Sequence, residues 1–151
     1  RDWMSDPAEL RTVDVCSIVA KFQACCQKER GFDVAKVIAG IEEFGAWADA
    51  LGLHLLPLAN RICLTLCQAI KVWQSRSVQE ALWGCASHVC TALGATVGRA
   101  LVTPFVEWLL KEGKWGNGYL KALRRMLHCS GITMSTSSRQ RLEHATLRQI
   151  F

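Results

Sequence analysis

The chain has 151 residues, of which half are apolar and only 21% are charged. A chain of this length forms one domain with a substantial core, and this composition excludes a largely disordered protein. The formal net charge of +5 comes from scattered basic residues with one cluster at 121–125. No nucleic-acid motif accompanies them, so we expect the charge to favour solubility rather than nucleic-acid binding.

Three helices are predicted in the first half of the chain. The first covers about 6–28, because an aspartate followed by proline is a typical helix start. Apolar residues at helical spacing predict a second, amphipathic helix over 33–51. The stretch 55–73 is apolar on every side and has Arg61 near its start. We predict that it is a central core helix, too short to span a bilayer comfortably.

The second half continues with helices. The nearly uncharged stretch 78–102 predicts another long apolar helix, with Ser77 as its N-cap. A short helix is expected over 104–111, and a last helix over 117–128 carries basic residues on its outer face. No stretch alternates with the period of a strand. The predicted fold class is therefore all-α, with two central apolar helices surrounded by amphipathic ones.

Composition changes near residue 130. A Ser/Thr-rich stretch follows, so we assign 1–129 to a helical domain and 130–151 to a polar linker with a short C-terminal helix over 139–151. The first ten residues are mostly polar and predict no signal peptide. The charged residues after 128 predict no stable transmembrane anchor.

The eight cysteines give no convincing site for chemistry. Cys63 and Cys67 lie one helical turn apart, and Cys85, His88 and Cys90 are close in sequence, but no paired CxxC motif exists. Cysteines in apolar helices behave as small hydrophobic residues, so we expect free thiols, no metal, no cofactor and a reducing compartment. Neither a nucleophile elbow nor a phosphate loop is present, and we expect no enzyme.

One motif near the C-terminus resembles a known family. The stretch 107–120 reads EWLLKEGKWGNGYL and resembles the second homology region of the B-cell lymphoma 2 (Bcl) apoptosis regulators. In that family a glycine ends one helix and a tryptophan fills the corner before the next. Lys114 replaces the second glycine of the family pattern. The residues that match the structural corner are Trp108, Gly113, Trp115, Gly118 and Tyr119.

The resemblance also covers Arg61. The family opens its central helix with Asn-Trp-Gly-Arg, and here Ala59 and Asn60 precede the arginine. A third homology region is expected near 10–13, where the family's Gly-Asp pair is missing. An alternative register places Trp83-Gly84 in the first region. The resemblance spans roughly residues 8–127 and is typical of a divergent member, for which a viral origin and an interaction with host proteins are one hypothesis.

The resemblance implies a Bcl-like helical bundle that inhibits apoptosis. Such members bind the amphipathic death-motif (BH3) helix of pro-apoptotic proteins in a hydrophobic groove, using four apolar anchors and one acid. Arg61 would pair with the acid of the partner helix. Such a protein is expected in the cytoplasm, or peripherally at mitochondria. The residues expected at the groove are Ile18, Phe22, Trp47, Leu51, Leu58, Asn60, Arg61 and Leu64.

Several alternatives stay open on the sequence. Phe22, Trp47 and Leu51 would be core residues in any helical bundle, and Arg61 could pair internally with an acid such as Glu42, Glu43 or Glu80. The chain could be a pro-apoptotic, membrane-permeabilising member of the family. It could also be an unrelated helical adaptor that oligomerises, and a homodimer is compatible with either reading.

Overall fold

The computed structural model of the protein describes residues 14–27, 33–112 and 117–130. This part of the chain contains helices and their connections and no β-strand, which confirms the all-α class. The helices predicted to start at residue 6 and residue 139 begin outside it. The elements are α2 (Val15–Cys26), α3 (Val34–Leu51), the 3-10 helix η2 (Gly52–Leu58), α4 (Ala59–Val72), α5 (Arg76–Leu93), α6 (Ala95–Glu112) and α7 (Asn117–Ser130).

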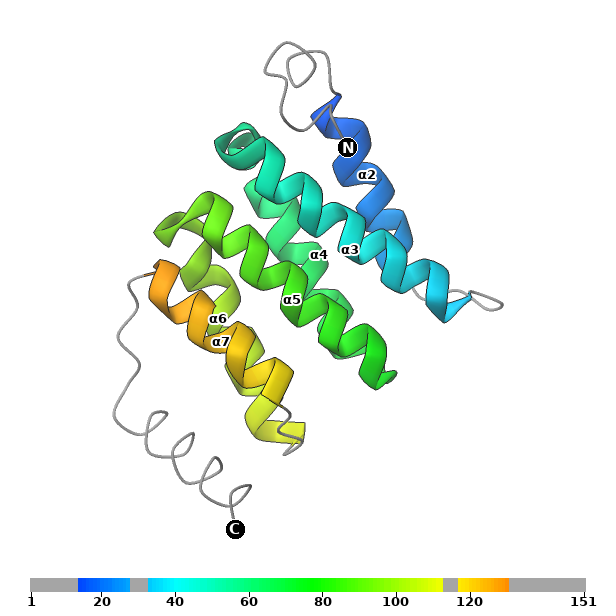
Figure 1. Cartoon of the computed structure of the whole chain (residues 1–151), viewed down its shortest axis with the longest axis vertical. Coiled ribbons are helices and arrows are strands. Elements are labelled where there is room, and N and C mark those ends of the chain that lie inside the picture. The colour runs from blue at the N-terminus through cyan, green and yellow to red at the C-terminus, as the bar shows by residue number, and fades with distance from the viewer. Residues whose placement is uncertain (1–13, 28–32, 113–116, 131–151) are drawn as a thin grey trace.

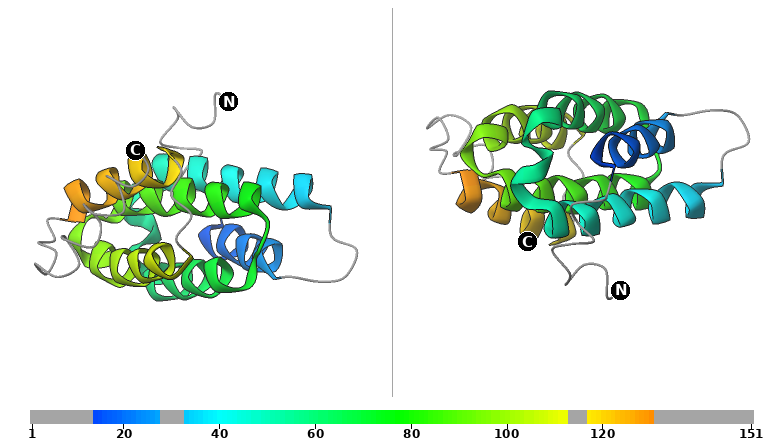
Figure 2. Two further views of the ribbon diagram at one scale, coloured as in Figure 1. Left: turned by 90° about the horizontal axis from the view of Figure 1, so that it is seen from below. Right: turned by 90° about the horizontal axis from the view of Figure 1, so that it is seen from above.

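The helices are arranged in two layers (Figures 1 and 2). In the front layer α3, α5 and α7 lie side by side and run in the same direction, with α5 in contact with both neighbours. Behind it α4 contacts α6, and α2 contacts both α3 and α4. Helices α2, α4 and α6 run opposite to the front three, and α2 lies between α3 of the front layer and α4 of the back layer.

The helix at the centre is α5, not the predicted helix 55–73. Most of the surface of α5 is buried, and it contacts α3, α4, α6, α7 and η2. In contrast, α4 begins only at Ala59 and exposes one face, on which Leu64 is 58% and Val72 49% exposed. The prediction of a helix buried on every side was wrong because a low charge does not require burial, and many apolar atoms of folded proteins remain exposed.

A glycine divides the second predicted apolar helix. α5 ends immediately before Gly94 and α6 begins immediately after it, so the predicted helices 78–102 and 104–111 are wrong in their boundaries. Gly94 has a φ of 68°, and its N–H donates to the carbonyl of Cys90 at 2.8 Å. Because glycine adopts a positive φ without steric strain, it can end α5 and allow the chain to reverse direction.

α6 continues through Pro104 without ending. Proline has no N–H, so the carbonyl four residues earlier, that of Ala100, lacks its helical donor. The thiol of Cys67 in α4 donates to this carbonyl, with Sγ 3.8 Å from the oxygen. The neighbouring helix thereby replaces part of the hydrogen bonding that proline removes.

Aspartates begin the first two described helices. The carboxylate of Asp14 accepts from the N–H and the hydroxyl of Ser17, at 3.2 and 2.7 Å. The carboxylate of Asp33 caps α3 by accepting from the N–H of Ala35 at 2.9 Å. These contacts satisfy N–H groups that have no partner inside the helix. The predicted helix over 33–51 is confirmed.

The predicted N-cap of α5 was wrong by two residues. Ser75 is the N-cap, because its carbonyl accepts the N–H of Gln79 at 3.0 Å, and Ser77 lies inside the helix. The amide of Gln79 donates back to the carbonyl of Trp73 at 2.8 Å and closes the connection from α4. At the other end of the bundle, the predicted helix 117–128 is present as α7.

An aromatic cluster joins α5, α6 and α7. The ring of Trp83 packs edge-on against Phe105, with ring centroids 5.0 Å apart, and Trp108 packs edge-on against Tyr119 at 5.7 Å. All four side chains are buried. Edge-to-face packing of this kind adds to the burial of large apolar surfaces. Of the other predicted corner residues, Gly118 is exposed, and Gly113 and Trp115 lie outside the described residues.

Candidate partner-binding surfaces on both sides of α2

An apolar hollow of about 300 Å³ lies between α2 and α3. Charged side chains lie at its edge, where the ammonium of Lys21 is 3.5 Å from the carboxylate of Glu43. A concave apolar surface with a charged edge can accept an apolar side chain of a partner. The hollow is lined by Ile18, Lys21, Phe22, Cys25, Lys36, Ala39, Gly40, Glu43, Phe44 and Trp47.

The walls of this α2–α3 hollow are fixed by close helix contact. Phe22 and Phe44 stack with ring centroids 4.0 Å apart and an interplanar angle of 9°. The thiol of Cys25 donates to the carbonyl of Val37 at 3.3 Å, and a Cβ at Gly40 would collide with the same sulfur. Glycine at position 40 therefore permits the close approach of the two helices.

A second hollow, of about 520 Å³, lies on the opposite side of α2, along its seam with α4. The indole of Trp73 donates to the carbonyl of Cys26 at 2.8 Å and joins the two helices at one end of the seam. Toward the other end, the guanidinium of Arg61 donates from Nη2 to Oε1 of Gln23 at 2.6 Å. The seam is lined by Gln23, Cys26, Gln27, Thr65, Gln68, Ala69 and Val72.

Arg61 contacts no carboxylate among the described residues. The alternative of internal pairing is not supported there, because Glu43 pairs with Lys21 and Glu80 with Arg76, at 3.2 Å. Arg61 is exposed, and its described polar partner is the neutral amide of Gln23. A guanidinium in this position can exchange a neutral acceptor for a carboxylate, which forms a stronger, charge-assisted hydrogen bond.

Two large apolar side chains lie exposed on α4 on the same face as Arg61. Leu64 and Val72 are 58% and 49% exposed, and they stand on either side of Gln68, one helical turn from each. Residues at this spacing lie on one face of a helix. The exposed edge of α4 therefore combines one cation with a short apolar strip beside the hollow.

The eight residues expected at one groove are divided by α2. Ile18, Phe22 and Trp47 lie around the α2–α3 hollow, while Arg61 lies on the α4 side of the same helix. Expectation and structure differ because α2 packs against both α3 and α4 and fills the space between them. The remaining four are placed as follows: Leu51 is buried, Leu58 is half-buried at the end of η2, and Asn60 and Leu64 are exposed.

Sequence reasoning missed the amide side chains of the seam. Gln23 lies in the last turn of α2, Gln27 follows the end of that helix, and Gln68 lies on α4. The spacing of Gln23 and Gln27 is a usable signal, because polar residues four apart in sequence favour one side of a helix. The sequence gives no direct sign that this side faces Arg61.

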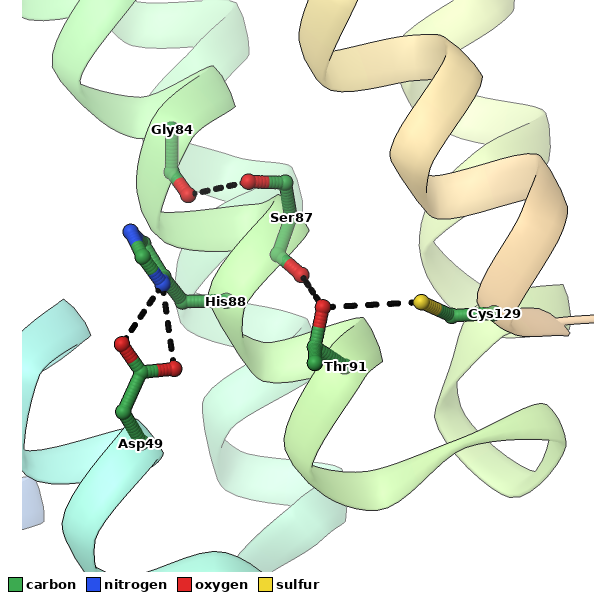
Figure 3. Close-up of polar contacts among 6 residues, drawn as sticks. All are labelled: Asp49, Gly84, Ser87, His88, Thr91 and Cys129. Carbon is green, nitrogen blue, oxygen red and sulfur yellow. Dashed lines mark hydrogen bonds and ion pairs between the residues drawn. The ribbon is translucent and has the colours of Figure 1, made fainter.

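A third hollow, of about 430 Å³, separates α3 from α5. At its end Nδ1 of His88 lies 3.0 and 2.9 Å from the two carboxylate oxygens of Asp49 (Figure 3). On the other side of α5 the hydroxyl of Thr91 donates to the Ser87 carbonyl at 2.9 Å and lies 3.5 Å from Sγ of Cys129. These contacts link α5 to both of its neighbours in the front layer.

Burial holds four of the thiols, those of Cys26, Cys63, Cys85 and Cys90, in their protonated form. Burial raises the pKa of Cys63 to about 11 and of Cys26 and Cys90 to about 12, and it raises the pKa of Cys85 well above its usual value. A thiolate rather than a thiol binds metals and attacks electrophiles. Within the described ranges no group of three or more His, Cys, Asp or Glu side chains is placed to hold a metal ion.

No family model, curated protein or solved structure matches the chain. The likeness to the Bcl regulators therefore depends on the residues quoted from the sequence, and the surfaces on both sides of α2 must be interpreted from their own chemistry.

Proposed function

We propose that the protein inhibits apoptosis by binding the amphipathic death-motif helix of pro-apoptotic Bcl-family proteins along the α2–α4 seam. The observation that carries this proposal is the environment of Arg61. This exposed cation lies beside the hollow, and its described polar partner is the neutral amide of Gln23. A partner helix with one acid and several apolar residues on one face complements this arrangement. The resemblance around Trp108 and Tyr119 supports the same partner class.

The acid of the partner would replace Gln23 at Arg61. Both side chains are at the surface, so the released amide can bind water and little is lost when the 2.6 Å hydrogen bond breaks. The new bond joins two opposite charges, and hydrogen bonds to charged groups contribute about 1.5–3 kcal/mol. This difference favours acidic over neutral residues at one position of the partner.

Apolar contacts would contribute the rest of the affinity. Leu64 and Val72 are available on α4 and can contact apolar side chains on one face of the partner helix, whereas the hollow beside them is lined mainly by polar side chains. Each apolar surface covered contributes about 25 cal/mol per Å². The α2–α3 hollow is a second acceptor for an apolar side chain, reached from the other side of α2.

Titration with labelled death-motif peptides tests the proposal. Arg61→Glu is expected to weaken binding at least about tenfold, because it places two carboxylates opposite each other. Arg61→Gln, which keeps a donor but removes the charge, should have a smaller effect. Arg99→Glu, at an exposed arginine of α6, makes the same charge change away from both hollows and should bind like the wild type. A folded wild-type protein that binds none of the peptides would exclude the proposal.

A pair of substitutions separates the two sides of α2. Leu64→Asp places a charge on the exposed strip of α4, and Ile18→Asp places one at the α2–α3 hollow. If the seam with α4 is the main site, the first substitution weakens binding by about tenfold or more and the second has the smaller effect. A larger loss of binding in Ile18→Asp than in Leu64→Asp would instead indicate that the α2–α3 hollow is the main site. Circular dichroism on both variants checks that the helices are intact.

One observation favours a second function, membrane permeabilisation. Residues 34–72 contain an 18-residue window with a mean hydropathy of 1.4 that is only 39% buried, enough by length and composition for a membrane span. In the structure this stretch is divided into α3, η2 and α4, with a positive φ of 52° at Gly52. Leakage of dye from vesicles by the purified protein would support this function over sequestration.

A further inference from the structure

The front layer exposes a surface along α5 that is made mostly of small side chains. Ser77, Ala81, Gly84 and Thr91 lie exposed or half-buried along one side of the helix, with His88 among them and the exposed Arg76–Glu80 ion pair beside its first turn. A Cβ added at Gly84 would have nothing within 4 Å. Two helices with small residues at their contact can approach to the short end of the usual 8–10 Å spacing. Small residues alone do not identify a partner, so the partner is inferred from the charged residues that flank them.

Acidic residues flank this surface on the α3 side. Glu42 is exposed and lines the hollow between α3 and α5, and Asp49 is exposed two turns further along the same face. Asp49 also contacts His88, which fixes its position beside α5 (Figure 3). Glu42 forms no ion pair with any described residue. The α3 side of the layer therefore carries negative charge toward solvent.

Basic residues flank the surface on the α7 side. Lys121, Arg124, Arg125 and His128 are all exposed on α7, and none of them forms an ion pair within the described part of the chain. Arg125 lies one turn before Cys129, whose sulfur contacts Thr91 on α5. Residues four apart lie on the same side of a helix, so Arg125 is on the side of α7 nearest α5. The two edges of the front layer thus carry opposite charges.

The charged residues of the two edges also lie at corresponding levels along α5. Tyr119 contacts Trp83 at 5.9 Å and Cys129 contacts Thr91, so α7 runs parallel to α5. Glu42 lines a hollow together with Glu80, and Asp49 contacts His88, so α3 runs parallel to it as well. Glu42 therefore lies within a helical turn of the level of Lys121, and Asp49 is level with Arg125.

We propose that two copies of the chain dimerise through their front layers, related by a two-fold axis parallel to α5. This rotation places α5 on α5 and brings α3 of each copy opposite α7 of the other. Because levels along the axis are kept, Glu42 meets Lys121 of the partner subunit and Asp49 meets Arg125 of the partner subunit. A two-fold axis perpendicular to α5 would instead oppose α3 to α3 and acid to acid. Charge therefore selects the first arrangement.

The dimer goes beyond the proposed partner site and leaves it accessible. The seam with Arg61 lies between α2 and α4, and α4 belongs to the back layer. A second copy on the front layer therefore does not cover it. The contact between the copies is polar and its charges are exposed, so its strength is expected to fall as salt shortens the screening length from about 10 Å at 0.1 M to about 3 Å at 1 M.

Sedimentation equilibrium on the full chain tests the dimer. The wild type is expected to approach twice the 16.8 kDa mass of one chain at low ionic strength and to dissociate toward monomer as salt is added. Glu42→Lys and Lys121→Glu each place like charges opposite one another twice, and each is expected to weaken the dimer at least about tenfold. Arg99→Glu changes the charge on α6 and should leave the dimer intact.

An equimolar mixture of the two variants gives the decisive result. In the proposed geometry Glu42→Lys in one copy meets Lys121→Glu in the other, and the second contact keeps its native pair, so the mixture should recover the dimer. Gly84→Gln, a surface change at the helix contact, should prevent dimerisation without unfolding the chain. A monomeric wild type at every concentration, or single variants that dimerise normally, would overturn the proposal, as would a mixture that stays monomeric.

Discussion

Arg61 and Gln23 are the side chains on which the proposed partner site depends. Arg61 could be identified from the sequence because it is the only charge between Leu55 and Ile70. Its contact with Gln23 joins residues 38 positions apart. This contact could not be predicted from the sequence, because no local pattern shows which helices pack against each other. Helical spacing likewise identified Phe22 and Trp47 as inward-facing, but only the packing of α2 between α3 and α4 shows which side of α2 each residue lines.

Two buried thiols predict how stability depends on pH. Burial raises the pKa of Cys26 and Cys90 to about 12 in the native state, against about 8.5 in the unfolded chain. Above the lower value the unfolded chain loses protons that the native chain keeps. The free energy of unfolding should therefore fall between about pH 9 and pH 12, by up to about 1.4 kcal/mol per pH unit for each thiol.

Urea denaturation at pH 8 and pH 10 measures this effect. Cys90→Ala removes one of the thiols and should reduce the dependence of stability on pH, whatever its own cost to packing. Identical pH dependence in the wild type and the variant would show that the thiol does not titrate differently in the two states.

At the scale of elements, the glycines divide the chain in ways that composition alone did not predict. The helices over 33–51 and 117–128 followed from periodicity and caps, because their ends coincide with Asp33 and with a change to polar residues. The helix expected over 78–102 was predicted with the wrong end. The chain reverses direction at Gly94, which has a positive φ that a hydrophobicity pattern does not show. Proline usually ends a helix, but Pro104 lies inside α6, where the thiol of Cys67 contacts the carbonyl that proline leaves without a donor.

Gly94 is predicted to be essential for the turn between α5 and α6. Its φ of 68° and ψ of −149° lie in a region that is almost restricted to glycine. Gly94→Ala should therefore lower the free energy of unfolding by about 1–3 kcal/mol. Gly84→Ala is the control in the same helix, where an added methyl group meets open space and should stabilise α5 by up to about 1 kcal/mol. Equal stabilities of the two variants in urea would contradict the assignment.

At the scale of the whole molecule, the arrangement of helices departs from a pair of central helices enclosed by others. Two layers share the core, and α5 contacts α3, α4, α6, α7 and η2. Hydrophobicity identified the apolar stretches but did not show which of them lies at the centre of the fold. The reason is that α4 and α5 are similarly poor in charge and differ mainly in how many neighbouring helices cover them. The number of neighbours depends on the path of the chain, which no single helix determines.

This arrangement predicts an order of local opening. α2 packs mainly on α3, α4 and η2, whereas α5 is covered on most of its sides. Native-state hydrogen exchange should therefore protect the amides of α5 most strongly and those of α2 less, since opening α2 breaks fewer buried contacts. Binding of a death-motif peptide at the α2–α4 seam should slow exchange in α2 and leave α5 almost unchanged. Uniform protection across both helices would contradict this order.

The alternation of helix direction has a consequence for the electric field around the protein. Each α-helix carries a dipole along its axis, and the front three point opposite to α2, α4 and α6, so these dipoles largely cancel. The field is then governed by side chains: negative beside Glu42 and Asp49, positive beside Arg124 and Arg125. The charge of the described part of the molecule is therefore separated across its helices rather than along them. A charged molecule that approaches it is oriented by this field, toward the α3 edge or the α7 edge, before any contact forms.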